Sequence, residues 1–244
     1  MKTEILFEDD DILICRKPAG FPTQTAKIGQ QDVVSELKNY LAKAIDKEDA
    51  KTAQKSKKEP YLGIVHRLDQ PVEGVLAFGK TPEATAYLTK SLQEGSLHKH
   101  YYAISYNQPF IEKGILEDYM IKDSKTNMAK IVPANTEGAK KAVLYYKIMD
   151  AKDGKVLYDI SIETGRFHQI RAQMAHADMP LLGDQKYADE RVKEYSREAG
   201  IKNVALCAYE LAIKHPRTKE ELSFVVQPEG AAFIDFFGDG GTFL

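Results

Sequence analysis

The chain opens with short apolar runs whose lengths suit β-strands. Residues 4–7 and 12–15 flank an aspartate-rich turn and predict a β-hairpin. From residue 33 to residue 41 the apolar positions recur at helical spacing, which predicts an amphipathic helix. Residues 43–60 then turn lysine- and acid-rich without any periodicity. We therefore expect 43–60 to form a flexible charged loop.

A polar insert lies between two apolar, β-prone runs at residues 66–74. The insert reads His-Arg-Leu-Asp-Gln-Pro-Val-Glu-Gly, and it predicts a turn between two buried strands. Pro71 and Gly74 suit a sharp reversal, because proline fixes φ and glycine accepts positive φ. This turn would hold the carboxylate of Asp69 on a rigid scaffold. A plain surface ion pair between Arg67 and Asp69 is the alternative.

A second polar constellation follows an alternating strand pattern at residues 156–162. The turn pair Asp153-Gly154 opens that strand, and the pattern changes to helical spacing from Phe167 onward. The strand therefore leads to the start of a helix, where backbone N–H groups and the helix dipole favour anionic partners. The polar side chains at this helix start are Arg166, His168, Gln169 and Arg171.

The remaining elements give the fold class. Thr81 and Pro82 mark the start of a helix, strands dominate to residue 163, and a further helix is expected near 188–198. Strands recur at 204–214 and 221–227. The pattern predicts an α+β fold, with a mixed sheet that carries helices on its outer faces.

Six sequence blocks make the chain resemble the RluA-type RNA pseudouridine synthases, and they occur in the order found in that family. The resemblance implies a curved, largely antiparallel sheet with flanking helices and a central active-site cleft. It also implies isomerisation of uridine to pseudouridine in structured RNA. The blocks are residues 16–20 (RKPAG), 66–69 (HRLD), 99–103 (KHYYA), 164–171 (TGRFHQIR), 180–184 (PLLGD) and 206–209 (LCAY) followed by His215-Pro216.

The resemblance assigns three catalytic residues. Asp69 acts as a nucleophile or as a proton acceptor, and the sequence leaves both routes open. Tyr101 stacks on the uracil, which must be extruded from its RNA stem to reach the carboxylate. Arg171 keeps Asp69 ionised and oriented through a close ion pair.

A further set of residues is expected to contact the substrate. Leu206 would form the apolar floor of the pocket, and Arg67 would hold a phosphate or occupy the space that the target base leaves. His168 is expected to support the loop through hydrogen bonds. The full substrate-binding set is Lys17, His66, Arg67, Lys99, Arg166, His168 and Leu206. We expect no metal and no cofactor, because the rearrangement needs neither redox change nor group donor.

Two positions depart from the family pattern. Val72-Glu73 replaces the usual Thr-Ser before the glycine of the Asp69 loop, and Gln173 stands where a histidine is common. A carboxylate near the RNA entrance would repel phosphate. We therefore expect Glu73 to face away from the pocket or to be held by a cation, Arg16 or Lys17.

Charge and composition are those of an ordinary globular protein. The 34 Lys and Arg residues against 36 Asp and Glu residues give a net charge of −2, whereas nucleic-acid binders are usually more basic. Six lysines against two acids between residues 120 and 147 favour a local basic face. Cys15 and Cys207 lie in apolar runs and are expected to be buried small hydrophobes.

The length of 244 residues allows a substantial core, built as one domain or as a closely fused pair of halves. We expect a single catalytic domain over 1–244, without a separate N-terminal RNA-binding module. Neither a bilayer-length apolar run nor a secretion signal is evident, so a cytoplasmic monomer is expected. The partner RNA is a transfer RNA or a ribosomal RNA.

Two other classes of function remain open. A metal-dependent hydrolase could use His66, Asp69 and His168, for which the His-x-x-Asp spacing gives some support. An RNA-binding relative without catalysis, acting on RNA folding, is the other alternative. Retention of Asp69, Tyr101, Arg171 and Leu206 favours the synthase.

Overall fold

Two compact units make up the chain in the computed structural model, which describes residues 1–27, 29–52, 59–106 and 111–238. The first unit comprises Met1–His98 and Leu211–Val226, and the second comprises Lys99–Glu210 and Gln227–Leu244. Strand β10 (Leu206–Lys214) contributes residues to both. That the two units act as a single catalytic domain stays a prediction.

The first unit is built on antiparallel strands. The predicted hairpin is β1 (Glu4–Glu8) with β2 (Ile12–Lys17), and β2 pairs on its other side with β4 (Glu73–Gly79). β3 (Gly63–Ile64) also pairs with β4, and β11 (Glu221–Val225) pairs with β10. Every residue of β4 is buried, which explains why the strand after the Asp69 loop reads as a continuous apolar run.

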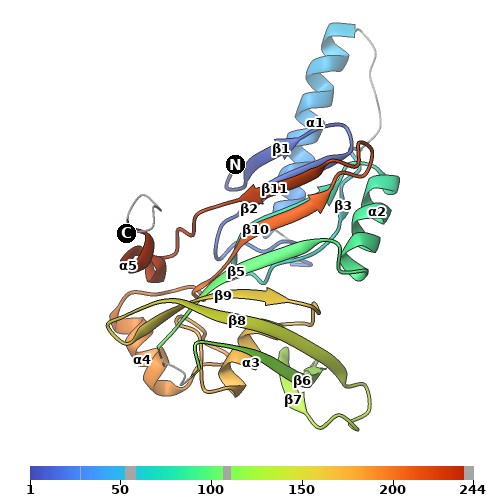
Figure 1. The fold of residues 1–244 in the computed structure, drawn as a ribbon. Helices are drawn as coiled ribbons and strands as arrows, with labels where there is room; N and C mark the ends of the chain where they lie inside the picture. The colour runs from blue at the N-terminus through green and yellow to red at the C-terminus, as the bar shows by residue number, and fades with distance from the viewer. Residues whose placement is uncertain (28, 53–58, 107–110, 239–244) are drawn as a thin grey trace. The chain divides into compact units, whose positions relative to one another are not determined.

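Helix α2 (Pro82–Gln93) begins where the sequence predicts. The Thr81 hydroxyl accepts a hydrogen bond from the backbone N–H of Ala84 at 3.1 Å, and Pro82 occupies the first turn. The helix packs against β3 and β4 through its buried residues Ala84 and Leu88 (Figure 1).

Helix α1 (Val33–Thr52) corrects the expected loop at 43–60. The helix continues through residues 43–52, and residues 53–58 lie outside the described residues. Residues 43–52 lack apolar periodicity, yet they include three lysines and two alanines and contain neither proline nor glycine. These residue types favour a helix intrinsically, so a charged helix forms where the pattern alone indicates a loop.

The second unit is built on long antiparallel strands in the order β5-β9-β8-β6-β7, with β10 beside β5. The strands are β5 (His98–Ser105), β6 (Lys113–Asp123), β7 (Met128–Val132), β8 (Lys140–Lys152) and β9 (Lys155–Ile162). Asp153 and Gly154 have positive φ values of 51° and 76° and close the β8–β9 hairpin, as their sequence predicts.

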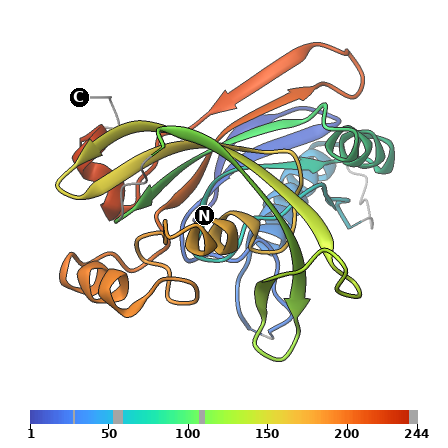
Figure 2. The ribbon, with the colours of Figure 1, turned by 60° about the horizontal axis from the view of Figure 1, so that its bottom comes forward.

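Two helices follow β9 in the second unit, α3 (Gln169–His176) and α4 (Glu190–Glu198). α3 packs against β6, β7 and β8, where Met120, Ala129, Ala142 and Ala172 form a cluster (Figure 2). The short helices η1 (Ala231–Phe233) and α5 (Ile234–Phe237) come last. The elements confirm the α+β class, and every pairing with a described register is antiparallel.

Two smaller expectations concern burial. Cys15 and Cys207 are both buried thiols, as their apolar surroundings predict. Within the described part of the chain, no helix has both the length and the apolar character needed to cross a bilayer.

Candidate functional site

The Asp69 loop in the first unit is held through its own backbone. The carbonyl of Asp69 accepts a hydrogen bond from the N–H of Val72 at 3.1 Å, which closes the predicted turn. The Thr23 hydroxyl donates to the carbonyl of Leu68 at 2.9 Å and lies 3.2 Å from the N–H of the same residue. Asp69 itself is half-buried. Its carboxylate therefore projects from a turn whose position is fixed on both sides.

Lys17 lies beneath this loop and not on its surface. Its fully buried ammonium donates to the carbonyls of Pro18 at 3.0 Å, Phe21 at 2.6 Å and Gln70 at 3.0 Å. Burial lowers the pKa of Lys17 to about 7, while the charges of Asp69 and Glu73 act in the opposite direction. The expected contact of Lys17 with substrate stays a prediction. The three donors of Lys17 are used to tie its own strand end to the residue after Asp69.

Glu73 is held by a cation, as the sequence predicts. Its carboxylate is almost fully buried at the start of β4 and lies 3.8 Å from the guanidinium of Arg16. The same guanidinium lies 3.8 Å from the exposed carboxylate of Glu4. The acid that departs from the family pattern thus has its charge opposed by Arg16 inside the first unit.

His66 and Arg67 behave differently from each other. His66 is buried, and its Nε2 accepts a hydrogen bond from the N–H of Ala77 at 3.2 Å, so this ring fastens the loop to β4. The expected contact of His66 with substrate stays a prediction. Arg67 is exposed and donates to Gln24 at 3.3 Å. Arg67 remains on the surface, where a phosphate could reach it.

Tyr101, Lys99 and Leu206 lie in the second unit. Tyr101 is a buried residue of β5 opposite Ile160 on β9. Lys99 is partly exposed, and burial of its ammonium lowers its pKa to about 8. Leu206 is buried at the start of β10. The side chains thus have the apolar and cationic character expected of a base pocket, although their substrate contacts stay predictions.

Arg171 has a partner that the sequence reasoning missed. Its Nε and Nη2 donate to the two carboxylate oxygens of Asp184, each at 2.8 Å, and both side chains are buried. Asp184 Oδ1 also accepts from the backbone N–H groups of Lys186 at 2.9 Å and Tyr187 at 3.2 Å. The signal was the block at 180–184, which matches the family but had no assigned role. The pairing of Arg171 with Asp69 joins residues of different units and stays a prediction.

Polar side chains at the start of α3 are bonded to other groups of the second unit. The Gln169 side chain accepts from the N–H of Arg166 at 2.9 Å and from the Thr164 hydroxyl at 2.9 Å, and it donates to the carbonyl of Val143 at 3.0 Å. Arg166 is exposed, with its Nε donating to the carbonyl of Lys141 at 2.9 Å. The Gln169 amide thus satisfies one backbone donor just before α3, the N–H of Arg166. The expected contact of this helix start with an anionic partner stays a prediction.

His168 supports the loop, as expected. The residue has a φ of 53°, and its ring stacks on that of Phe167 with the two ring centroids 3.8 Å apart. Its Nδ1 lies 2.8 Å from the hydroxyl of Tyr187. That hydroxyl also accepts from the backbone N–H of Ala129 at 2.6 Å. Tyr187 thus connects the turn before α3 with β7, and it is the second residue that the sequence reasoning missed.

Gln173 joins α3 to the sheet. The fully buried Nε2 of Gln173 lies 3.1 Å from the carbonyl of Leu116, 2.7 Å from Asp118 and 3.3 Å from the carbonyl of Ala142. The replacement of the common histidine is therefore compatible with a structural link between this helix and β6 and β8.

A group of possible metal ligands lies elsewhere in the first unit. One ligand atom each of Asp9, Asp11 and His215 falls within 4.8 Å of the others. The His215 Nε2 donates to Asp9 at 2.8 Å, while Nδ1 accepts from the N–H groups of Arg217 and Thr218. Both ring nitrogens are thus used in joining the β1–β2 turn to the β10–β11 turn.

Comparisons with other proteins agree with the family resemblance of the six sequence blocks. A sequence model of the family described as RNA pseudouridylate synthase matches residues 11–176. Ribosomal large subunit pseudouridine synthase D of Neisseria meningitidis is 32% identical over 231 residues, covering 92% of this chain and 58% of that protein. Ribosomal large subunit pseudouridine synthase C of Rickettsia conorii is 29% identical over 194 residues, covering 79% of this chain and 59% of that protein. The chain thus spans somewhat less than two thirds of these relatives.

Solved structures share the fold. Human RNA pseudouridylate synthase domain containing 4 superposes with a TM-score of 0.70 at 22% identity, covering 92% of this chain and 88% of that one. Human RNA pseudouridylate synthase domain containing 1 superposes with a TM-score of 0.72 at 16% identity, covering 93% of this chain and 84% of that one. The family match covers more than half of the chain and includes the Asp69 loop, Tyr101 and Arg171. The chain therefore belongs to the RNA pseudouridylate synthase family.

Proposed function

We propose that this protein isomerises uridine to pseudouridine in RNA, with Asp69 as the reacting carboxylate. The family match across residues 11–176 carries this proposal. The bond from ribose to the uracil nitrogen breaks, the base turns, and a ring carbon joins the sugar, so no atoms are gained from a donor. Asp69 attacks as a nucleophile or accepts a proton if a glycal-like intermediate forms.

The chain's own groups support each part of this reaction. Lys17 and Thr23 fix the backbone on both sides of Asp69, and Arg16 opposes the charge of Glu73. Tyr101 would stack on the extruded uracil, and such stacking is worth roughly 1–3 kcal/mol, enough to offset an extrusion that costs a few. Leu206 would form the apolar floor.

Arg171 would orient Asp69 in this proposal. The two hydrogen bonds to Asp184 use Nε and Nη2 and fix the plane of the guanidinium. Contact with Asp69 would therefore be made through the other N–H groups of the guanidinium. A guanidinium close to a carboxylate favours its ionised form, which both chemical routes require.

We further propose ribosomal RNA of the large subunit as the first substrate to test. The names of the relatives from Neisseria meningitidis and Rickettsia conorii support this choice, and transfer RNA is the alternative. Arg67, Lys99, Arg166 and His168 are the proposed RNA contacts. Cytoplasmic location and a monomeric state are parts of the same proposal.

The test compares Asp69→Asn with Asp10→Asn, the same change at an exposed acid of the first unit. Release of tritium from RNA labelled at uracil carbon 5 reports the reaction. When that carbon forms the new glycosidic bond, its hydrogen is released to water. Asp69→Asn should lose about 10⁴-fold or more in single-turnover rate while RNA binding is kept, and Asp10→Asn should match wild type. Residual activity within about tenfold of wild type would remove Asp69 from the mechanism.

A further inference from the structure

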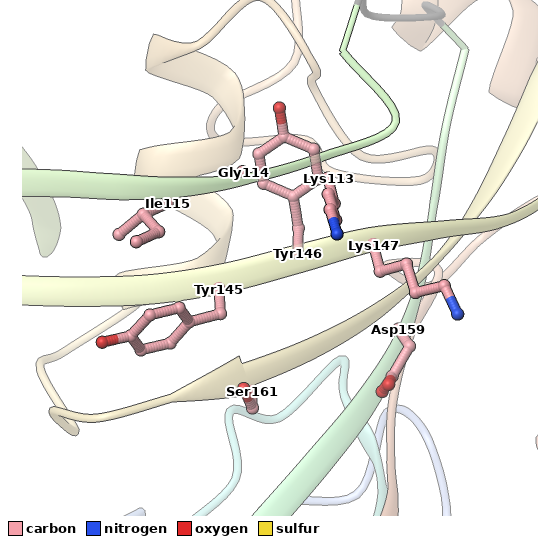
Figure 3. Close-up of a pocket in the computed structure, with 8 residues that line it drawn as sticks. All are labelled: Lys113, Gly114, Ile115, Tyr145, Tyr146, Lys147, Asp159 and Ser161. Carbon is pink, nitrogen blue, oxygen red and sulfur yellow. The ribbon is translucent and has the colours of Figure 1, made fainter.

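An open groove crosses three strands of the second unit. Its volume is about 370 Å³, and it is lined by residues of β6, β8 and β9 (Figure 3). Volumes of this size hold small organic groups such as a nucleotide base. No role has been given to these residues above, and the catalytic residue Tyr101 lies on a different strand, β5.

Strand register explains which side chains line the groove. Lys113, Lys147 and Asp159 are direct partners across the three strands and form one row. Ile115, Tyr145 and Ser161 form a second row two residues further along, and therefore on the same face. The row between them, Gly114, Tyr146 and Ile160, points to the opposite face.

The groove combines an apolar half and a cationic half. Figure 3 shows Ile115 and Tyr145 to one side of Ser161, with Lys147 and Asp159 to the other. Ile115 is 60% exposed and Tyr145 40% exposed, although they face each other directly across two strands. Tyr145 donates its hydroxyl proton to Glu163 at 3.0 Å, so its flat ring is held in place. A pre-oriented aromatic ring beside an exposed aliphatic side chain suits the face of a planar base.

Two lysines at the groove, Lys113 and Lys147, lie outside its ion pairs. Asp159 lies 3.1 Å from His100 and accepts from Tyr209, and the hydrogen bond to Asp159 raises the pKa of His100. Glu117 pairs with Lys141 at 2.9 Å. Lys113 and Lys147 form no ion pair with any described residue. Like charges directly opposite on adjacent strands repel each other, and a bound anion would relieve that repulsion.

We propose that this groove binds a single-stranded segment of the RNA substrate, with one base on Tyr145 and Ile115 and flanking phosphate on Lys113 and Lys147. An aromatic ring together with cations on an open sheet face is a recurring means of binding single-stranded RNA. The inference rests on the proposed function for the presence of RNA. It adds a binding surface on β6 and β8, in addition to the proposed contacts on the loops.

The experiment uses the full chain and a fluorescein-labelled oligouridylate of about 12 nucleotides, a length within the usual range for single-strand sites. Tyr145→Leu keeps an apolar side chain but removes the ring, and should weaken binding by about tenfold. Tyr145→Phe keeps the ring and should bind within about twofold of wild type. Thermal melting of each variant checks that the fold is kept.

Salt dependence tests the cations separately. Replacing both Lys113 and Lys147 with glutamine should reduce the slope of log affinity against log salt by about 1.4, since each phosphate contact of a single strand contributes about 0.7. The matched control replaces Lys202 and Lys214, two exposed lysines that do not line the groove, with glutamine and should leave the slope unchanged.

Equal behaviour of the groove pair and the control pair would overturn the inference. So would unchanged oligouridylate binding by Tyr145→Leu together with a change in its sedimentation, because the groove would then contact a protein, such as a second copy of the chain. Tritium release by the same variants separates the two proposals. If wild type forms pseudouridine through Asp69 but groove variants bind normally, the proposed function stands and the inference fails.

Discussion

At the scale of single residues, the buried Lys17 supports the loop that carries Asp69. Lys17 donates to three backbone carbonyls, and one of them belongs to Gln70, next to Asp69. Removing the ammonium would leave the buried carbonyl of Phe21 without its donor, which costs about 1–3 kcal/mol, and would free two partly buried carbonyls at a smaller cost. The position of Asp69 therefore depends on a residue that does not need to touch substrate.

The lowered pKa of Lys17 predicts a pH dependence of stability. Burial brings the folded-state pKa from 10.5 to about 7. Between these values the unfolded chain keeps the proton and the folded chain loses it, so this group makes the free energy of unfolding rise as pH increases from about 7 toward 10.5. Urea unfolding at several pH values should show that rise in wild type and a flatter curve in Lys17→Met. Parallel curves would show that Lys17 does not titrate in this range.

The ion pair of Glu73 predicts a separation of stability from chemistry. Glu73→Ser removes the buried partner of Arg16 while the exposed Glu4 remains, so we expect the free energy of unfolding to fall by about 1–3 kcal/mol. The single-turnover rate should stay close to wild type. Glu4→Ser is the control and should cost less than about 1 kcal/mol. A large fall in the rate with RNA binding unchanged would place Glu73 in the reaction.

At the scale of elements, the two hydrogen bonds between Arg171 and Asp184 fix α3 to the segment that follows it. Both side chains are buried, and each carboxylate oxygen accepts from a separate nitrogen of the guanidinium. Asp184 also collects the N–H groups of Lys186 and Tyr187. One carboxylate thus organises both a helix and the turn beyond it.

A double-mutant cycle measures this coupling. Arg171→Ala and Asp184→Ala should each lower the free energy of unfolding by about 3–5 kcal/mol, because each removes one partner of a buried ion pair. The double variant should lose clearly less than the sum of the two. The exposed pair of Lys193 and Glu190, 2.9 Å apart, is the control and should couple by less than about 1 kcal/mol. Additive losses at Arg171 and Asp184 would contradict the proposed coupling.

Local signals predicted the elements well where they were sufficient on their own. The Thr81 cap, the Asp153-Gly154 turn and the apolar runs around the Asp69 loop all form as expected. The continuation of α1 was missed because its residues favour a helix without showing an apolar stripe. Sequence patterns do not reveal side chains that serve buried backbone groups. Lys17 and Gln169 therefore looked like surface polar residues.

At the scale of the whole molecule, the net charge of −2 hides an uneven arrangement. In the described chain several acids accept hydrogen bonds from nearby side chains, as Asp9 does from the imidazole of His215 and Asp11 does from the guanidinium of Arg217. Partial burial raises the pKa of Asp9, but the backbone donors of Ile12 and Asp11, together with His215, bring it below its usual range. A nearly neutral chain can therefore still present local basic regions to RNA.

Metal removal provides a test at this scale. We expect pseudouridine formation to survive treatment with EDTA, because the proposed chemistry uses one carboxylate. The possible ligands Asp9, Asp11 and His215 also already bond to protein groups. Activity before and after EDTA, followed by zinc addition, is the measurement. Loss of activity with rescue by zinc would favour the metal-dependent hydrolase.

The way the Asp69 loop is anchored bears on how its sequence can change during evolution. Thr23 and Lys17 donate hydrogen bonds to the backbone carbonyl oxygens of Leu68 and Gln70, and every amino acid has such an oxygen. Substitutions between Asp69 and β4 can therefore accumulate without moving the carboxylate, provided that any new charge is neutralised nearby. Glu73 beside Arg16 is an example of such drift. Selection on this loop should consequently be strict at the anchoring side chains, which lie far away in sequence, and relaxed at the loop positions themselves.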